Sequence, residues 1–359
     1  MKKSMRLAVV GCGGISRTIA LFGRMNRKIS LSSACDVSEE RAGAFARRYG
    51  ISRIFTDYNA LLEQDSPDAV YLAVPHHLHY GMIEKALQAG VPVFAEKPVT
   101  RTLEEGMKIH RSSEETGVAV GVNYQHRYSR GGYKLARTVQ SGILGRIHAV
   151  RINVPWCRRS GYFIKSPWHC RAEYAGGGTL ITQGSHFLDL ALWALKGDVP
   201  RSATGYTAMR RFGANPDTPE GRLDLDVEDL AQGIIEMESG ALVQINSTMA
   251  ASSEQKTTIE FYGEKGTAFY SSFLFSSVRF RNVSAGAFGF PVKGLDAHQK
   301  SLEGFRSWIM DGTSYLTPAG EALPALAAVE AIYKSALSGR NEDIAVLTDR
   351  ADQPGRNST

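Results

Sequence analysis

Lys97 follows a short apolar segment, residues 91–95, which reads as a buried strand ending in Glu96-Lys97-Pro98. In an open α/β sheet, ligands bind at the carboxyl ends of the strands, so an ammonium group here would face a ligand. A fixed cation at that place can hold a substrate oxygen and stabilise the negative charge that develops on it. An isolated Lys-Pro pair is more often part of a solvated surface, but two further segments favour the functional interpretation.

His186 offers a second reactive group, in a segment that begins with three glycines at residues 176–178. If this segment is a helix, positions at intervals of four, three and four share one face: Thr182, His186, Asp189 and Trp193. A neutral imidazole on that face can act as a general base. One alternative is a hydrogen-bonded core histidine. A metal site with Asp189 is the other, but no second His-acid or Cys-His cluster accompanies it, so we expect no metal.

A glycine-rich turn near the amino terminus has the chemistry of a dinucleotide site. It follows a strand candidate at residues 5–10 and reads Gly11-Cys12-Gly13-Gly14-Ile15-Ser16. Glycines permit a tight turn and let backbone N–H groups approach a pyrophosphate at the start of the next helix. The third small position carries Ser16 where the pattern usually has Gly or Ala, and an ordinary strand-to-helix loop is the alternative.

Asp36 supports the dinucleotide interpretation. It follows a second strand candidate, residues 31–35, and lies 23 residues beyond Gly13, near the spacing of a carboxylate that binds the adenosine ribose. The alternative is a helix N-cap or a turn residue. Asp36 would repel the 2′-phosphate of NADP, and the nearest cation is Arg41, so we expect NAD to be preferred.

Strand-like and helix-like segments alternate through the first third of the chain. Apolar runs at residues 69–74, 91–95 and 118–122 alternate with amphipathic stretches at residues 80–89 and 103–116. This alternation indicates right-handed βαβ units and a parallel sheet. We therefore expect an α/β protein in which residues 1–124 form a Rossmann domain for a dinucleotide.

The second part of the chain has a different pattern. Strand candidates pair as hairpins at residues 229–249 and 257–272, and residues 321–338 form a helix candidate rich in Ala and Leu. We expect residues 125–347 to form an α/β domain for substrate binding and oligomerisation. Residues 348–359 have no apolar pattern and are expected to be a disordered tail.

A basic and aromatic stretch, residues 155–172, leads into the glycine segment. It has no Asp or Glu, and its cations alternate with rings: Arg158, Arg159, Lys165 and Arg171 with Trp156, Tyr162, Phe163, Trp168 and His169. At the mouth of a cleft it would suit an anionic or nucleotide-linked sugar. A solvated basic loop held by its aromatic residues is an equal alternative.

Composition excludes several other classes of protein. The chain has 359 residues, 43% of them hydrophobic, which is enough for two cores. Its net charge of +6 is spread among interspersed acids, and no nucleic-acid recognition motif is present. The four cysteines form no CxxC pair, and no apolar run suits a signal peptide or a membrane span. We therefore expect a soluble, reduced protein of the cytoplasm.

The order of these motifs resembles the Gfo/Idh/MocA family of oxidoreductases. The resemblance rests on residues 11–16, residues 73–79, Glu96-Lys97-Pro98 and residues 176–189, and so extends over most of the chain. It implies an N-terminal Rossmann domain followed by an α/β domain with an open, mostly antiparallel sheet. It also implies a nicotinamide cofactor between the domains, and homo-oligomers packed through that sheet.

The resemblance gives roles to individual residues. Lys97 matches the family's substrate-contacting lysine, and His186 matches its catalytic histidine. Cofactor contacts are implied for Gly11, Gly13, Gly14, Ile15, Ser16, Asp36, Val74, Pro75, His76, His79, Glu96 and Lys97, and substrate contacts for Lys97, Tyr124, Arg127, Arg158, Trp168, Thr182 and His186. Many dehydrogenases of the family carry Asp or Asn where this chain has Thr182. A hydroxyl can bind a substrate but cannot hold the charge of the histidine.

We therefore expect an NAD-dependent oxidoreductase, with NADP possible, acting on a secondary alcohol or ketone of a sugar, a sugar derivative or a cyclitol. The sugar derivative would be acidic or nucleotide-linked if residues 155–172 face the cleft. His186 would be the general base, and Lys97 would stabilise charge on the substrate oxygen. Two alternatives use the same scaffold: a glycoside hydrolase that keeps NAD bound, and a cofactor-binding regulator without turnover.

Overall fold

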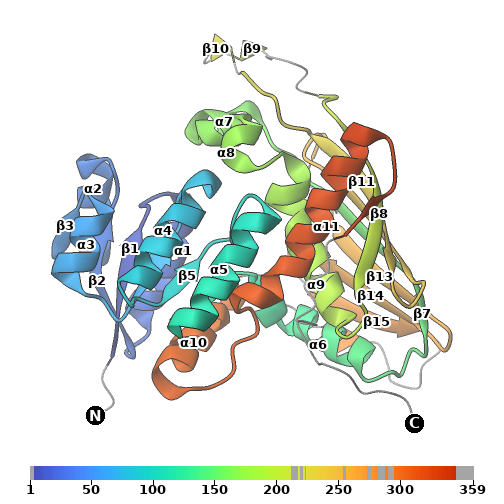
Figure 1. Cartoon of the computed structure of the whole chain (residues 1–359), viewed down its shortest axis with the longest axis horizontal. Coiled ribbons are helices and arrows are strands. Elements are labelled where there is room, and N and C mark those ends of the chain that lie inside the picture. The colour runs from blue at the N-terminus through green and yellow to red at the C-terminus, as the bar shows by residue number, and fades with distance from the viewer. Residues whose placement is uncertain are drawn as a thin grey trace, which may run out of the picture.

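Two sheets lie side by side in the computed structural model, one in each half of the chain (Figure 1). The structure describes residues 4–211, 217–218, 221–222, 224–253, 256–272, 276–281, 288–289 and 295–344. The tail expected at residues 348–359 lies outside these ranges.

The first sheet is parallel, as expected, with the strand order β3-β2-β1-β4-β5-β6. The strands are β1 Met5–Val10, β2 Ile29–Cys35, β3 Arg53–Phe55, β4 Ala69–Leu72, β5 Val93–Ala95 and β6 Val120–Val122. The order reverses between β1 and β4, and this switch point is where a Rossmann sheet binds its dinucleotide.

Helices follow the strands of this sheet: α1 Gly14–Met25, α2 Glu39–Tyr49, α3 Tyr58–Asp65, α4 His79–Gln88 and α5 Leu103–Thr116. The bounds of α5 are those expected from the sequence, and local chemistry explains them. The Thr102 side chain accepts a hydrogen bond from the Glu105 amide and caps the first turn. Gly117 has a φ of 68° and ends the helix in the left-handed conformation that glycine tolerates best.

The second sheet is open and mostly antiparallel, again as expected. Its order is β16-β15-β14-β13-β7-β12-β11-β8-β17, and within the described residues β7 and β12 form its one parallel pair. The two expected hairpins are β11 with β12 and β13 with β14. The strands are β7 Ile147–Pro155, β8 Pro200–Ala208, β11 Leu230–Met237, β12 Leu242–Thr248, β13 Thr257–Gly263, β14 Thr267–Ser272, β15 Ser276–Arg281, β16 Phe288–Gly289 and β17 Glu342–Asp343, while β9 Asp217–Thr218 and β10 Gly221–Arg222 form a separate pair.

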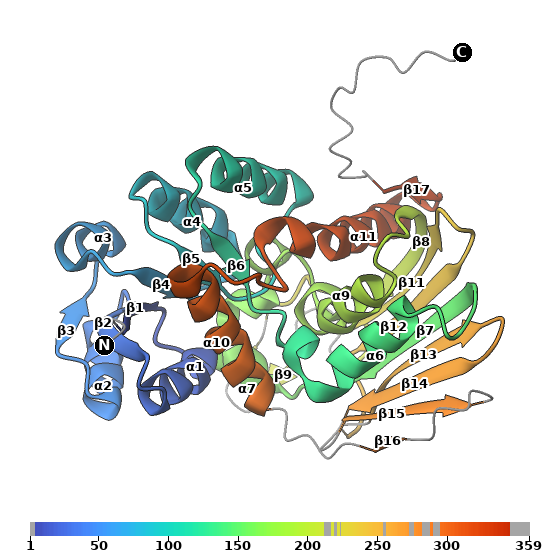
Figure 2. The same cartoon turned by 90° about the horizontal axis from the view of Figure 1, so that it is seen from below.

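Helices cover one face of this sheet (Figure 2): α6 Arg130–Gln140, α9 Ser185–Ala194 and α11 Ala319–Ser338. α11 packs closely on the strands because Gly205 and Gly233 lack side chains. A Cβ at either glycine would lie 2.4 Å from an atom of Ile332. α11 continues through Pro324, which lies in its early turns.

A late helix, α10 Leu295–Asp311, returns to the first domain and packs on α1 (Figure 2). The Phe305 ring stacks on Phe94 of β5 with 5.0 Å between ring centroids, a contact typically worth about 0.5–1.5 kcal/mol beyond the burial of its area. Gly121 of β6 forms a backbone bridge with Pro318. Residues far along the chain thus complete the core of the Rossmann domain, and the division at residue 124 stays a prediction.

No helix within the described residues is long and apolar enough to cross a membrane. Cys12, Cys35, Cys157 and Cys170 are free thiols. The cytoplasmic location itself stays a prediction.

Candidate active site

The glycine-rich turn joins β1 to α1, and its glycines serve two purposes. Gly11 has a φ of 84°, and a Cβ there would lie 2.2 Å from the Ala73 carbonyl oxygen, so the backbone itself requires glycine. Gly13 and Gly14 differ, because a Cβ at either would meet nothing within 4 Å. The protein's own packing does not require these two glycines, and their bare backbone leaves space for a ligand.

The turn presents the start of α1 as an anion site. Gly13 caps the helix without a side-chain hydrogen bond, and the first turn contains no acidic residue. The positive end of the helix is therefore open to a phosphate. The buried Ser16 hydroxyl donates a hydrogen bond to the Gly11 carbonyl oxygen and ties the turn together, while Ile15 beside it is exposed. These features fit the pyrophosphate of a dinucleotide.

Asp36 lies directly after β2 and contacts the same turn. Its carboxylate accepts hydrogen bonds from the Cys12 amide at 3.0 Å and the Ser38 amide at 2.9 Å. Arg41 donates from Nε and from a terminal nitrogen to Asp36 Oδ1 at 3.0 and 2.8 Å. Burial opposes ionisation, but the hydrogen bonds from Arg41, Ser38 and Cys12 outweigh it and lower the pKa of Asp36. The N-cap of α2 is Ser38, not Asp36.

The segment after β4 binds the Lys97 loop. His79 is fully buried, with Nδ1 2.9 Å from the Pro98 carbonyl oxygen and Nε2 3.0 Å from the Val74 carbonyl oxygen. In the short helix η1 His76–Leu78, Nδ1 of His76 lies 2.7 Å from the Ala175 carbonyl oxygen. Burial lowers the pKa of both histidines. Cofactor contacts by these residues, by Val74 and by the adjoining Pro75 stay predictions.

Glu96 and Lys97 make different contacts at the end of β5. Oε1 of Glu96 accepts hydrogen bonds from the Tyr71 hydroxyl at 2.6 Å and from Asn123 Nδ2 at 2.7 Å, so the carboxylate is held in the core. Nζ of Lys97 donates to the Thr182 carbonyl oxygen in the second domain at 2.6 Å. Burial lowers the pKa of Lys97 to about 8, which Glu96 partly opposes and Arg158 reinforces.

The three glycines let the helix of His186 dock on the second sheet. A Cβ at Gly178 would lie 1.9 Å from the Glu228 carbonyl oxygen. The Glu228 carboxylate accepts hydrogen bonds from the amides of Gly178 at 2.6 Å and Leu180 at 3.0 Å, and from the Tyr333 hydroxyl at 2.8 Å. It thereby satisfies amides that a helix start leaves unpaired. The next residues form a π-helix, Leu180–Gly184, which runs into α9.

Thr182 uses its two oxygen atoms differently. The carbonyl oxygen accepts the hydrogen bond from Lys97. The hydroxyl has Gly178 O at 2.5 Å and Gln183 Oε1 at 2.7 Å as acceptors. A substrate contact by this hydroxyl therefore competes with hydrogen bonds inside the helix, and that contact stays a prediction.

His186 lies one turn later, with 8% of its surface exposed. Its Nδ1 atom has no hydrogen-bond partner in the described part of the chain. Tyr124, nearly fully buried, stands edge-on to the ring at 6.3 Å between centroids. Burial lowers the pKa of His186 well below its usual value, and Lys97 lowers it further, so the imidazole is a neutral proton acceptor.

His126 is a site residue that sequence reasoning missed. It lies in η2 Gln125–Tyr128, directly after β6, and its ring is perpendicular to that of His186 at 5.3 Å between centroids. Burial lowers its pKa to about 3. The rule that drew attention to Lys97 at the end of β5 applies equally to the end of β6 and would have found it.

Arg158 lies among the aromatic side chains of the basic stretch. Its guanidinium lies 4.7 Å from the Trp156 ring and 5.2 Å from the Tyr162 ring. Its Nε atom is buried and unpartnered among the residues that the structure describes. Arg171 instead forms ion pairs with acids at residues 224 and 226, and Arg159 and Lys165 are exposed. Arg158 is thus the cation of this stretch that is placed to bind an anion.

Residues 160–175 bridge the two halves of the chain through α7 Ser160–Lys165, η3 Pro167–Cys170 and α8 Ala172–Ala175 (Figure 1). The Trp168 ring packs on His169 at 3.6 Å and on His76 of the Rossmann domain at 4.6 Å between centroids. Tyr174 packs on His77 at 4.8 Å. This bridge brings Trp168 into contact with His76 of the Rossmann domain.

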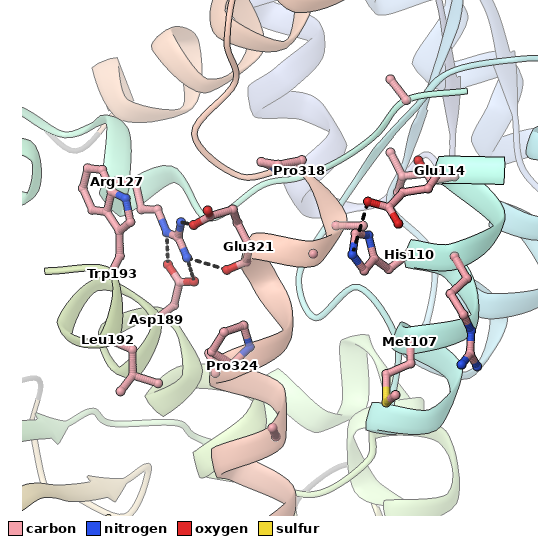
Figure 3. Close-up of a pocket in the computed structure, with 18 of the residues that line it drawn as sticks. Met107, His110, Glu114, Arg127, Asp189, Leu192, Trp193, Pro318, Glu321 and Pro324 are labelled. Atoms are coloured by element: carbon pink, nitrogen blue, oxygen red, sulfur yellow. Dashed lines mark hydrogen bonds and ion pairs between the residues drawn. The ribbon is translucent and has the colours of Figure 1, made fainter. Parts of the chain in front are cut away.

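Arg127 is not brought together with Lys97 and His186. It is bonded to Asp189 and Glu321 and lines a separate cavity of about 1130 Å³, whose lining does not include Lys97 or His186 (Figure 3). Every N–H of its guanidinium bonds to the protein. The geometry therefore does not support the substrate contact that the resemblance implied for Arg127.

The same ion pair removes the metal interpretation of His186 and Asp189. Both carboxylate oxygens of Asp189 accept hydrogen bonds from Arg127. Nowhere among the residues described do His, Cys, Asp and Glu side chains gather in a group that could hold a metal ion.

Two family models match the chain. The model described as an oxidoreductase family with an NAD-binding Rossmann fold matches residues 5–124. The model of the GFO/IDH/MocA C-terminal domain matches residues 133–269. The first range contains the parallel sheet, and the second contains most of the antiparallel one.

Similar proteins act on sugars. D-glucoside 3-dehydrogenase of Escherichia coli (strain K12) is 24% identical over 95% of this chain and 97% of that protein. D-apiose dehydrogenase of Paraburkholderia graminis is 27% identical over 99% of this chain and 94% of that protein. The structure of the WlbA dehydrogenase of Bordetella pertussis, in complex with NADH and UDP-GlcNAcA, is 27% identical, with a TM-score of 0.81 over 96% of this chain and 100% of that chain.

Proposed function

The chain belongs to the GFO/IDH/MocA family of oxidoreductases, and we propose that it is an NAD-dependent dehydrogenase of a secondary hydroxyl group on a sugar, a sugar derivative or a cyclitol. The observation that carries this proposal is that a lysine of one domain reaches the helix that carries the histidine of the other. Lys97 of the Rossmann domain reaches the helix of His186 through the Thr182 carbonyl oxygen. Both side chains are largely withdrawn from water. A fixed charge acts most strongly in such a water-poor site.

The residues of the site divide the work of oxidation. Gly13, Gly14 and the start of α1 would hold the cofactor pyrophosphate, and Asp36 its ribose hydroxyls. When bound, NAD supplies the hydride acceptor. His186, neutral because of its burial, would remove the hydroxyl proton. The Lys97 ammonium would donate a hydrogen bond to the same oxygen and stabilise the charge that grows on it.

An acidic sugar, free or nucleotide-linked, is the substrate class that we propose first. Arg158 supports it, because a half-buried guanidinium whose Nε is buried and unpartnered among the described residues would gain from a carboxylate or phosphate. The similar WlbA dehydrogenase has an acidic nucleotide sugar, UDP-GlcNAcA, in its complex. The relatives named for glucosides and apiose favour a neutral sugar as the second candidate.

A substrate screen tests both candidates. The purified protein with NAD is offered neutral sugars, cyclitols, sugar acids and nucleotide-linked sugars, and NADH formation is followed by absorbance. We expect a sugar acid to give the highest kcat/KM, and Arg158→Gln to raise its KM while leaving a neutral sugar unaffected. If a neutral sugar is the best substrate and Arg158→Gln changes nothing, the acidic class is wrong.

The two alternatives give different readouts in the same screen. A glycoside hydrolase with retained NAD would release free sugar from a glycoside without net NADH. A regulator would bind NAD and turn over no compound. Lys97 and His186 speak against the regulator, since both reactive positions are intact.

We also propose that the protein forms a homo-oligomer through the open face of its second sheet. That face presents exposed apolar side chains from three neighbouring strands: Tyr206 of β8, Ile234 of β11 and Leu242 of β12. Their fractional exposures are 52%, 47% and 47%, which is unusual for large apolar groups on a sheet that stays in water.

A further inference from the structure

An ion pair between Arg127 and Asp189 joins the segment before α6 to the helix that carries His186 (Figure 3). Nε and a terminal nitrogen of Arg127 donate to Asp189 Oδ2 and Oδ1 at 2.9 and 2.7 Å. The two side chains are 3% and 0% exposed. Parallel hydrogen bonds from a rigid guanidinium fix orientation as well as distance. The pair therefore sets η2 in one position relative to α9.

Further contacts extend this junction to α11. Arg127 donates to the Leu316 carbonyl oxygen at 2.9 Å, to Glu321 Oε2 at 3.3 Å and to the Glu321 carbonyl oxygen at 2.7 Å. Its guanidinium also lies 5.4 Å from the Trp193 ring of α9. Three elements that are distant in sequence thus meet at one arginine.

The two members of the pair adjoin the two histidines of the cleft. Arg127 directly follows His126, and Asp189 lies about one helical turn after His186. The His126 and His186 rings are 5.3 Å apart and nearly perpendicular. No hydrogen bond from a described residue reaches Nδ1 of His186, so this nitrogen does not anchor the ring, and the elements that carry the two rings must position them.

We propose, resting on the function proposed above, that Arg127 and Asp189 are positioning residues for the reaction. Their ion pair holds His126 against His186 and so fixes the wall of the cleft at which His186 meets its substrate. Both residues line the cavity in Figure 3, whose lining includes neither Lys97 nor His186, so they would act without touching the substrate. Without the pair, η2 is free to shift against α9 and to carry His126 away from His186.

The pH dependence of the reaction should report this role. The titratable and charged groups that face His186 are Lys97 from the β5 loop, Tyr124 after β6, His126 from η2, His298 from α10 and Arg158 from the loop after β7. Burial is the largest influence that keeps His186 neutral. If η2 moves and water enters, that influence weakens and the pKa of His186 rises toward its usual value. Because the base must be neutral, the acidic limb of kcat/KM then moves to higher pH.

Asp189→Asn and Arg127→Lys test the proposal, since each keeps the size of its side chain but loses the bidentate ion pair. We expect kcat to fall by about 10²-fold, the usual cost of a small misplacement, and the acidic limb to move to higher pH, with NAD affinity unchanged. Asp65→Asn is the matched control. Asp65 is an equally buried carboxylate, paired with Arg6 and Arg53 at 2.8 Å, and lies far from the cleft. This control should lower Tm without changing the pH profile.

A second variant separates positioning from folding. Replacing a buried ion pair by apolar side chains of similar size often preserves stability, so Arg127→Met combined with Asp189→Leu should recover Tm but not kcat. If the double variant recovers both, or if Asp189→Asn has the same pH profile as Asp65→Asn, the pair is structural and the proposal is wrong.

A nuclear magnetic resonance titration of the histidine rings decides the question without a substrate. In the wild type, His126 and His186 should stay neutral to low pH, and in Asp189→Asn both should titrate at higher pH. Identical titration curves would overturn the proposal. If no compound is oxidised by the wild type, the proposed function fails, whereas this titration still tests the ion pair.

Discussion

Burial lowers the pKa of both Lys97 and His186, yet it leaves the two side chains in different charge states at neutral pH. It lowers the pKa of Lys97 to about 8 and the pKa of His186 well below its usual value. At neutral pH the lysine is still mostly charged and the histidine is neutral. A cation and a base can therefore act on one hydroxyl group at the same time.

We expect kcat/KM to fall as the pH rises through about 8, because Lys97 loses its proton and its charge there. The protonated lysine is the active form, so the activity is present below this pKa and lost above it. Lys97→Arg should have no such limb, since a guanidinium keeps its charge, even if its rate is lower. Initial rates of NADH formation against pH decide this. An alkaline limb that persists in the arginine variant would mean that another group titrates.

Asp36→Ala should weaken NAD binding and reduce the preference for NAD over NADP. The carboxylate that would bind the ribose is lost, and Arg41, released from its ion pair, becomes free to meet a 2′-phosphate. Dissociation constants for both cofactors provide the measurement, and Arg41→Ala is the control that should keep the preference for NAD. Tighter binding of NADP than of NAD by the wild type would contradict the expectation.

Motifs could nominate candidate reactive residues, but they could not show which side chains are already hydrogen-bonded within the protein. Lys97 and His186 follow from strand ends, glycines and spacing, all of which are local in sequence. The partners of Arg127 are Asp189, Leu316 and Glu321, which lie in elements whose approach depends on the whole fold. For the same reason the sequence did not show that the Thr182 hydroxyl bonds within its own helix.

At the scale of elements, the two glycine motifs have different roles: one leaves space for a ligand, and the other allows a helix to pack closely. A matched pair of variants should show the difference. Gly14→Ala should leave Tm unchanged, because the added methyl group meets nothing, but should weaken NAD binding where the pyrophosphate comes close. Gly178→Ala should lower Tm and the activity, because its Cβ would lie 1.9 Å from the Glu228 carbonyl oxygen.

Thermal melting and cofactor titration of the two glycine variants provide the measurement. Unchanged NAD affinity in Gly14→Ala would show that the pyrophosphate does not bind at this turn. Wild-type Tm in Gly178→Ala would show that the helix start can move away from Glu228 without cost.

Element boundaries were predictable where capping is local. The N-cap of α5 and the glycine that ends it are sequence signals, and the expected bounds are confirmed. The π-helix at Leu180–Gly184 was not predictable. Its start is held by Glu228 and Tyr333, which come from other elements. β3 was also missed, because Arg53–Phe55 is a short edge strand with little apolar pattern.

At the scale of the whole molecule, the exposed face of the second sheet predicts assembly. Ile234→Lys should shift the protein toward monomers, because it places an unpaired charge in the apolar patch that a second copy would cover. Leu337→Lys is the control, since Leu337 is 89% exposed near the end of α11, away from the sheet face. Sedimentation velocity measures the outcome. A wild type that sediments as a monomer at all concentrations would contradict the prediction.

The packing of α10 on the Rossmann domain could not be predicted from the order of elements along the chain. Phe305 packs on Phe94, and Tyr315 donates to the carbonyl oxygen of Val122 at 3.3 Å, both across long stretches of sequence. No local sequence pattern predicts such contacts. The alternation of strands and helices predicted the first sheet and the hairpin pattern predicted strands of the second, but neither pattern could assign a late helix to the early domain.

NADH formation by His186→Ala and Lys97→Ala, compared with the wild type on the best substrate of the screen, tests the central claim most directly. We predict that each variant loses about 10²-fold or more in kcat, while its dissociation constant for NAD and its Tm stay close to those of the wild type. Wild-type turnover in either variant, or unfolding of His186→Ala, would contradict the roles assigned to these two residues.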